Sequence, residues 1–191
     1  VAYKIGAPGL HVAMNSLAVL AACQLAGADL AKAALGLADF SAQKGRGERL
    51  QLVMRDGEIT VIDESYNANP ASMRAAIELL AVARTGRGGR RIAVLGDMLE
   101  LGEDSEKLHR ELAGPLETAT ADRIYLAGPM MKALWDVLPP HRRGAYSKRS
   151  AGLESILPGE LVPGDVVMIK GSFGSRMGIL VDALKARYGS A

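Results

Sequence analysis

The spacing of apolar residues at the start of the chain is typical of helices. Apolar side chains recur every three to four positions over 11–26 and again over 30–38, and this period predicts two helices. Gly27 stands where a C-terminal cap of the first helix is expected, and Asp29 stands where an N-cap of the second is expected. The chain therefore begins with a short helical segment.

The polar, glycine-rich run 43–48, QKGRGE, separates this segment from a different pattern. Such composition between two periodic regions is typical of a domain boundary. We therefore expect two parts, a helical segment over 1–44 and a second domain over 45–191.

Beyond the boundary, apolar runs and helical patterns alternate. Residues 49–54 and 58–63 read as strands joined by an Arg55-Asp56-Gly57 turn, which predicts a hairpin. The later predicted strands are 91–96, 122–128, a short one near Ala145, and 165–171; the later predicted helices are 70–84, 105–117, 130–137, a short one near Leu153, and 175–187.

Strands separated by helices predict βαβ units and a parallel sheet with right-handed crossovers. The strand segments are continuous apolar runs, which indicates strands covered on both faces. The predicted class is therefore α/β: a Rossmann-like, mostly parallel sheet with helices on both faces and an antiparallel hairpin at its start, preceded by a small helical segment.

Polar or glycine-rich loops follow four of the predicted strands, at 63–69, 96–102, Gly128 and 170–176. The carboxyl ends of parallel strands meet at one edge of a sheet, where open α/β folds bind their ligands. The sequence therefore predicts a binding cleft at that edge.

Helix capping explains part of this polarity, since Asn69, Asp104 and Ser175 each precede or begin a predicted helix. One cap would suffice in the first loop, so Tyr66 and Asn67 are surplus to it. An Asn side chain offers a donor and an acceptor together, which suits peptide or amide groups. We interpret this loop as part of a binding site.

The loop 170–176 combines Lys170 with Gly171, Gly174 and the start of a helix. A cation beside freed backbone amides and a helix start suits an anion such as a carboxylate or phosphate. We expect the Lys170 ammonium to emerge at the carboxyl edge of the sheet. An ordinary strand-to-helix turn with a surface lysine is the alternative.

Composition excludes several classes of function. A net charge of +2 is too small to imply a polyanionic partner, and the basic runs 84–91 and 141–149 lack interleaved aromatics apart from Tyr146. We interpret these runs as solvated loops and expect no nucleic acid partner. Cys23 is the only cysteine, which fits a reducing, cytoplasmic compartment, and the longest apolar stretch, 16–28, is too short to cross a bilayer.

Common catalytic signatures are missing from the sequence. It contains neither a Walker phosphate loop nor G-x-G-x-x-G, and no nucleophile elbow. Three histidines and one cysteine show no metal-ligand spacing. We therefore predict no metal site within this chain.

Four strings together carry a family resemblance. GLHVAMNSLAVLAA (9–22), DESYNANPASMRAAIELLA (63–81), RIAVLGDMLELGEDSEKLH (91–109) and VVMIKGSFGSRM (166–177) resemble the Mur ligase family, over essentially the whole chain. The family has a UDP-sugar domain, a central ATPase domain and a Rossmann-like C-terminal domain. The resemblance identifies 1–44 with the tail of the second and 45–191 with the third.

The resemblance implies a peptide ligase of cytoplasmic cell-wall precursor synthesis. The implied reaction joins D-Ala-D-Ala to UDP-MurNAc-tripeptide through an acyl phosphate, with ATP and Mg²⁺ held mainly by the central domain. These two molecules are the expected partners, and we expect a monomer that does not insert into membranes. The helical segment and second domain alone are expected to fold without ligating.

Carried over by position, the resemblance implies that Asn15 lies near the adenine and that Arg46 reaches the ATP phosphate. Asp63 matches an acid that touches the nucleotide, so its replacement by Ala is expected to reduce activity more than stability. Arg46 and Lys170 are the implied catalytic cations.

The same comparison implies a dipeptide site. Its implied residues form a wall and a loop that face the incoming dipeptide, namely Tyr66, Asn67 and Asn69, and Lys170, Gly171, Ser172 and Arg176. The sequence departs from the family at Phe173-Gly174, where the family often has an additional Arg.

Two alternatives stay open. The chain could belong to a sister amide ligase of the folylpolyglutamate or cyanophycin synthetase type, although the SYNANP string over 65–70 argues against it. It could also be a catalytically silent Rossmann-like binding module, because it carries no phosphate loop of its own.

Overall fold

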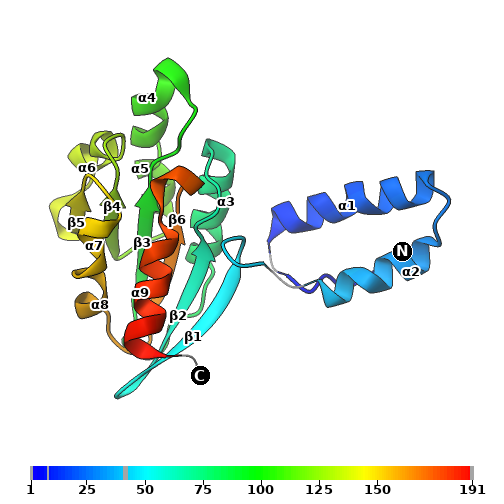
Figure 1. Cartoon of the computed structure of the whole chain (residues 1–191), viewed down its shortest axis with the longest axis horizontal. Coiled ribbons are helices and arrows are strands. Elements are labelled where there is room, and N and C mark those ends of the chain that lie inside the picture. Colours follow the sequence, from blue (N-terminus) through cyan, green and yellow to red (C-terminus); the bar gives the residue numbers. More distant parts are fainter. Residues whose placement is uncertain (1, 8, 41–42, 190–191) are drawn as a thin grey trace. The chain divides into compact units, whose positions relative to one another are not determined.

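The computed structural model describes residues 2–7, 9–40 and 43–189. The chain divides into two compact units, Val1–Gln43 and Lys44–Ala191, and each is described by itself. Figure 1 shows the elements of both units.

The first unit is helical, as predicted. It contains α1 (Leu10–Leu25), α2 (Leu30–Gly36) and the 3₁₀ turn η1 (Leu37–Asp39). The Asp29 carboxylate accepts hydrogen bonds from two backbone amides in the first turn of α2, so the predicted cap is confirmed. Gly27, with a φ of 76°, ends the α1 region in the left-handed conformation expected of a C-terminal cap.

The second unit contains a six-stranded sheet in the order β1-β2-β6-β3-β4-β5. Only β1 is antiparallel to its neighbour, and the other pairs are parallel. The predicted fold class is therefore confirmed. The strands are β1 Glu48–Met54, β2 Gly57–Glu64, β3 Arg91–Gly96, β4 Arg123–Ala127, β5 Arg143–Ser147 and β6 Val166–Lys170.

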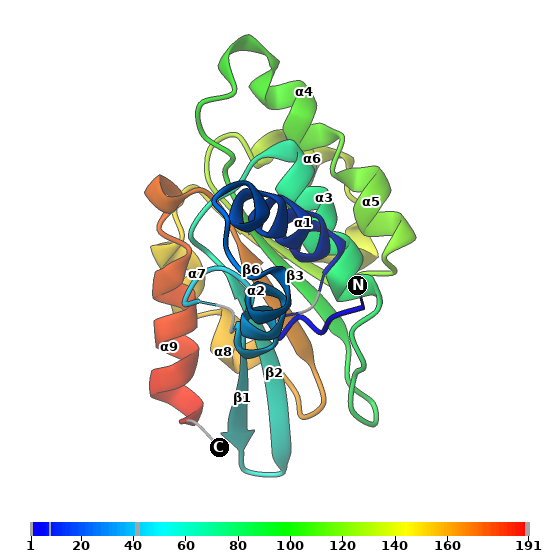
Figure 2. The same ribbon diagram turned by 90° about the vertical axis from the view of Figure 1, so that its right-hand side faces the viewer.

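Helices cover both faces of this sheet. In Figure 2, α3, α5 and α6 lie on one side of the strands, and α7 and α9 lie on the other. No helix among the described residues is long and apolar enough to cross a membrane. The helices are α3 Pro70–Ala81, α4 Ser105–Arg110, α5 Ala113–Thr118, α6 Lys132–Val137, α7 Ala151–Glu154, α8 Leu157–Glu160 and α9 Gly178–Tyr188, with 3₁₀ turns η2 Gly102–Asp104, η3 Pro140–Arg142 and η4 Phe173–Ser175.

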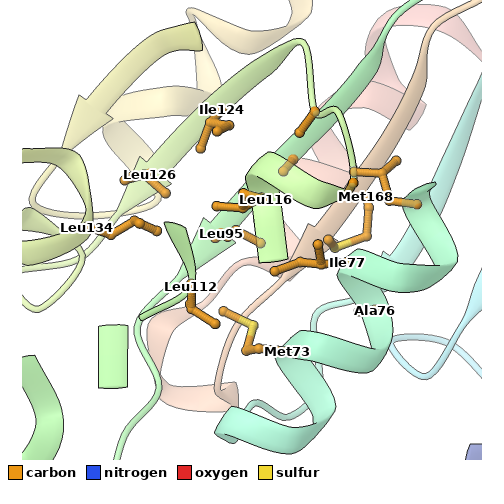
Figure 3. Close-up of a cluster of buried hydrophobic side chains, with 14 of the residues drawn as sticks. Met73, Ala76, Ile77, Leu95, Leu112, Leu116, Ile124, Leu126, Leu134 and Met168 are labelled. Atoms are coloured by element: carbon orange, nitrogen blue, oxygen red, sulfur yellow. The ribbon is translucent and has the colours of Figure 1, made fainter. Parts of the chain in front are cut away.

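Each face has its own apolar core. On the first face, Met73 and Ile77 of α3 meet Leu116 of α5 and the strand residues Leu95 and Met168, all fully buried (Figure 3). On the second face, buried side chains of α7, α8 and α9 pack on the same strands from the other side. The two cores fix the strand ends, and with them the loops of the carboxyl edge.

Three local predictions were wrong. The single helix predicted over 105–117 is two helices, because Pro115 has no amide to donate to the Glu111 carbonyl and its ring crowds that turn. Asp104 lies in a 3₁₀ turn with a φ of −79° and a ψ of 1°, and its side chain caps nothing. Ser175 also lies in a 3₁₀ turn, its hydroxyl donates to a carbonyl of that turn, and α9 begins after it.

Candidate active site

The carboxyl ends of four parallel strands lie side by side. In the strand register, Glu64 at the end of β2 pairs with Lys170 at the end of β6, and Leu95 of β3 pairs with the same Lys170. Gly96 of β3 pairs with Ala127 of β4. The loops predicted to share an edge therefore do so.

Asp63 is fully buried and fastens two segments to each other. One carboxylate oxygen accepts from the Gly45 amide at 3.0 Å, and the other accepts from the amide and hydroxyl of Ser65 at 3.1 and 2.6 Å. Gly45 has a φ of +75°, and a Cβ there would lie 2.9 Å from Cβ of Tyr66. The chain can pass this closely only as glycine. Asp63 thus holds residues 44–46 against the loop after β2, while its contact with a nucleotide stays a prediction.

Arg46, Tyr66 and Phe173 form an exposed stack beside the hydrogen bonds of Asp63. The Arg46 guanidinium lies 4.3 Å from the centre of the Tyr66 ring, and the Phe173 ring centre lies 5.5 Å from it. Tyr66 is 47% exposed and Phe173 is 73% exposed. Both rings line a cleft of about 720 Å³, which we call the aromatic cleft. An exposed cation over an aromatic face is worth about 0.5–1 kcal/mol, enough to bias the position of Arg46.

The two predicted asparagines are exposed but differ in what they do locally. Asn69 caps α3: its side-chain oxygen accepts from the Ser72 amide at 2.8 Å, and Ser72 Oγ accepts from the Asn69 amide at 3.0 Å. This reciprocal capping box confirms the predicted cap. Among the described residues, the Asn67 side chain bonds only its neighbouring amide, that of Ala68. Asn67 therefore keeps its amide group available on the surface.

Lys170 is at the expected edge but is not a free surface charge. Its side chain is 3% exposed, and its ammonium donates to the Asn67 carbonyl at 2.8 Å and to Glu64 at 3.4 Å. Burial lowers the pKa of the Lys170 ammonium, and the Glu64 carboxylate opposes that shift. The expectation of an ammonium that emerges from the sheet edge was therefore wrong. The Lys170 ammonium is buried and holds the loop after β2 by its bonds to Asn67 and Glu64.

Gly171 and Ser172 join three loops. A Cβ at Gly171 would lie 3.1 Å from Cα of Gly96, so the ends of β6 and β3 are in close contact. The Ser172 hydroxyl donates to the Ala68 carbonyl at 3.2 Å and accepts from the Leu99 amide at 2.9 Å. Both residues are buried, and they set the spacing of the loops.

Sequence reasoning missed a buried polar pair under the loop after β3. Asp97 accepts from the amides of Met130 and Met131, and burial raises the pKa of its carboxyl. His109 is fully buried, with Nε2 accepting from the Met98 amide and Nδ1 donating to the Ser105 carbonyl. His109 therefore bonds its own helix and also anchors the loop after β3. An acid that directly follows an apolar strand was the available signal.

A second cleft, of about 660 Å³, lies at the ends of β3, β4, β5 and β6. Arg176, exposed and left-handed with a φ of 56°, lines both this cleft and the aromatic cleft. Lys148 and Arg149 line the second cleft as well, although sequence reasoning assigned them to a solvated loop. The signal was their position directly after β5. We call this space the basic cleft.

Asn15 belongs to the first unit, where it lies exposed on α1. Its predicted place near the adenine stays a prediction.

A metal site fits the described residues poorly. Among residues 2–7, 9–40 and 43–189, no three or more His, Cys, Asp or Glu side chains gather as a cation site would require. Mg²⁺ is usually held by carboxylates together with substrate phosphates. The described residues therefore offer no cluster that would hold Mg²⁺ without the help of substrate phosphates.

Comparison with known proteins agrees with this geometry. The family model "Mur ligase, glutamate ligase domain" matches residues 48–173. A UDP-N-acetylmuramoyl-tripeptide–D-alanyl-D-alanine ligase from Rickettsia prowazekii is 32% identical over 172 residues, covering 90% of this chain and 37% of the relative.

Solved structures show the same likeness. MurF from Acinetobacter baumannii superposes with a TM-score of 0.78 at 26% identity, covering 96% of this chain and 39% of that one. A MurF ligase from Thermotoga maritima in complex with ADP has a TM-score of 0.66 at 26% identity, covering 88% and 37%.

A Rossmann-like sheet with this hairpin, and polar loops gathered at its carboxyl edge, is typical of a Mur ligase C-terminal domain. The chain belongs to the Mur ligase family and carries its glutamate ligase domain. It spans less than two-fifths of the length of the Rickettsia relative.

Proposed function

We propose that this chain is part of a ligase that joins D-Ala-D-Ala to UDP-MurNAc-tripeptide in the cytoplasm, with consumption of ATP. The relatives that match most of the chain carry the name of that activity. The observation that supports it most is the meeting of three loops at Ser172, which bonds both Ala68 and Leu99. Those loops contain the strings on which the resemblance rests.

The two compact units suggest that the chain contains parts of two domains. The boundary between Gln43 and Lys44 falls one residue from the domain boundary predicted from the sequence. We assign 1–44 to the end of a central ATPase domain and 45–191 to the C-terminal domain. The roles of Asn15 at the adenine and of Arg46 at the ATP phosphate stay predictions.

Two contacts make Arg46 suitable for a nucleotide phosphate. Asp63 fixes the amide of the preceding Gly45, and the Tyr66 ring supports the guanidinium. The charged group stays exposed, so a phosphate could bind it in a bidentate manner. In this proposal Asp63 acts on the nucleotide through the position of Arg46.

The dipeptide would bind along the exposed residues of the same edge. Tyr66, Asn67 and Asn69 present ring and amide groups to solvent, and Arg176 adds a cation. Gly171 and Ser172 would shape this surface from beneath. In this proposal ATP would transfer its γ-phosphoryl group to the tripeptide carboxylate and leave as ADP. The dipeptide amine would then attack that carboxyl carbon, form the amide bond with loss of a proton, and release phosphate.

The test is ligation by a full-length protein that contains this chain. We expect phosphate release that requires ATP, UDP-MurNAc-tripeptide and D-Ala-D-Ala together, and no release from the 191-residue chain alone. Turnover with folate and glutamate, or with a cyanophycin primer, would instead identify a sister ligase. Absence of turnover with every acceptor, despite native folding, would favour a silent binding module.

A further inference from the structure

The basic cleft contains cations that the fold itself does not use. The side chains of Lys148, Arg149 and Arg176 make no hydrogen bond or ion pair with any described residue. Lys148 and Arg149 follow β5, whereas Arg176 lies 27 residues further along, between β6 and α9. Two separate segments therefore bring unpaired positive charge to one cleft.

Negative charge in the same cleft is smaller. Asp97 lines it, but its oxygens accept from the amides of Met130 and Met131. Glu154 is the other acid that lines it, and it is exposed. Three free cations thus face one free carboxylate, and a cleft lined mainly by one sign of charge concentrates ligands of the opposite sign.

Part of the remaining wall is apolar, and Ser150 and Ser175 also line the cleft. Leu99, Ala127 and Ile179 line the cleft between the charged groups. A volume of about 660 Å³ is in the range of small-molecule sites. The cleft therefore suits a small ligand with an anionic end and short aliphatic side chains.

We propose that the basic cleft binds the carboxylate of the dipeptide, with Lys148 and Arg149 as the residues that recognise it. This rests on the proposed function and moves carboxylate recognition away from Lys170, whose ammonium is committed to Glu64 and Asn67. A carboxylate is favoured over a phosphate because Glu154 would repel a second negative charge, and because the apolar wall matches alanyl methyl groups.

The test is steady-state kinetics of the full-length ligase with the Lys148→Met, Arg149→Met double variant. We expect the KM for D-Ala-D-Ala to rise at least tenfold, with kcat at saturating dipeptide and the KM for ATP within twofold of wild type. Exchanging the two residue types, Lys148→Arg with Arg149→Lys, keeps both charges and should hold the KM within threefold of wild type.

The matched control removes two cations from the opposite edge. Arg84 and Arg87 are exposed in the loop before β3, and their side chains make no hydrogen bond or ion pair with any described residue. The Arg84→Met, Arg87→Met variant loses the same charge and should keep the wild-type KM. A similar rise in both double variants would show a general charge effect and overturn the proposal.

A neutral acceptor isolates the carboxylate. With D-Ala-D-alaninamide, wild type and the Lys148→Met, Arg149→Met variant should have the same KM within twofold, because the group that the cations bind is gone. An equal penalty with acid and amide, or a rise in the KM for ATP in place of that for the dipeptide, would overturn the proposal. If wild type itself ligates neither acceptor, the proposed function has failed, and this inference with it.

Discussion

The two edges of the sheet in the second unit both carry buried acids, but the aromatic cleft and the basic cleft both lie at the carboxyl edge, which we call the open edge. At the amino edge, Asp165 before β6 is fully buried and accepts from the Arg90 amide, Nε and Nη2 at 2.8, 3.2 and 2.7 Å, and from the Val162 amide at 2.9 Å. A Cβ at Gly89 would lie 2.0 Å from the Gly164 carbonyl oxygen, so the backbones there are in direct contact. This edge is closed by the fold's own bonds.

At the carboxyl edge, the buried side chains of Asp63 and Lys170 are also hydrogen-bonded, but exposed charged groups remain without a partner among the described residues. Asp63 and Lys170 are bonded to the protein, whereas Arg149 and Arg176 line clefts without a partner among the described residues. Polar composition therefore does not distinguish a functional edge from a structural one. Unpaired charge beside a cleft does.

The largest effect should come from the closed edge. Asp165→Ala removes four hydrogen bonds and leaves the guanidinium of Arg90 unpaired, so we expect the free energy of unfolding to fall by about 3–5 kcal/mol. Urea denaturation followed by circular dichroism measures it. A loss below about 1 kcal/mol, typical of an exposed ion pair, would remove the contrast between the edges.

Asp63→Ala should come next. It leaves the Gly45 and Ser65 amides without their acceptor, so we expect a loss of about 2–4 kcal/mol in unfolding free energy, together with lower ligase activity. Because Asp63 is buried and hydrogen-bonded, we expect its replacement to reduce stability more than the sequence alone suggested. Unchanged denaturation with strongly reduced turnover would instead support direct nucleotide contact.

Lys170→Met should have a smaller effect on stability. The Asn67 carbonyl loses its donor and Glu64 loses its counter-charge, for an expected loss of about 1–3 kcal/mol. We expect turnover to fall at least tenfold as the loop after β2 loses its support, with Lys170→Arg retaining more activity than Met. Equal turnover in Met and wild type would exclude Lys170 from the site.

The smallest stability effect should come from the basic cleft. Because Lys148 and Arg149 bond nothing in the described structure, their double replacement by Met should change the unfolding free energy by no more than about 0.5 kcal/mol. The Arg84→Met, Arg87→Met variant should match it. A clear destabilisation confined to the first pair would mean that these cations serve the fold.

The alternation of strands and helices could be predicted because it depends on local features of the sequence, namely apolar runs and turn residues. The sequence also placed the loops correctly, since parallel strands must end at a common edge. The burial and the hydrogen bonds of Lys170 could not be predicted, because its partners Glu64 and Asn67 lie 106 and 103 residues away in the sequence. The burial of His109 could not be predicted either, because its neighbours along the chain, Lys107, Arg110 and Glu111, are charged.

Nuclear magnetic resonance titration of the 191-residue chain with D-Ala-D-Ala tests most directly whether the open edge is the ligand edge. We predict that the amide signals of Gly128, Ser150 and Gly174 shift with one common saturation curve, while those of Gly86 and Gly164 at the closed edge stay in place. Shifts confined to the closed edge, or no saturable shift at either edge, would contradict the account.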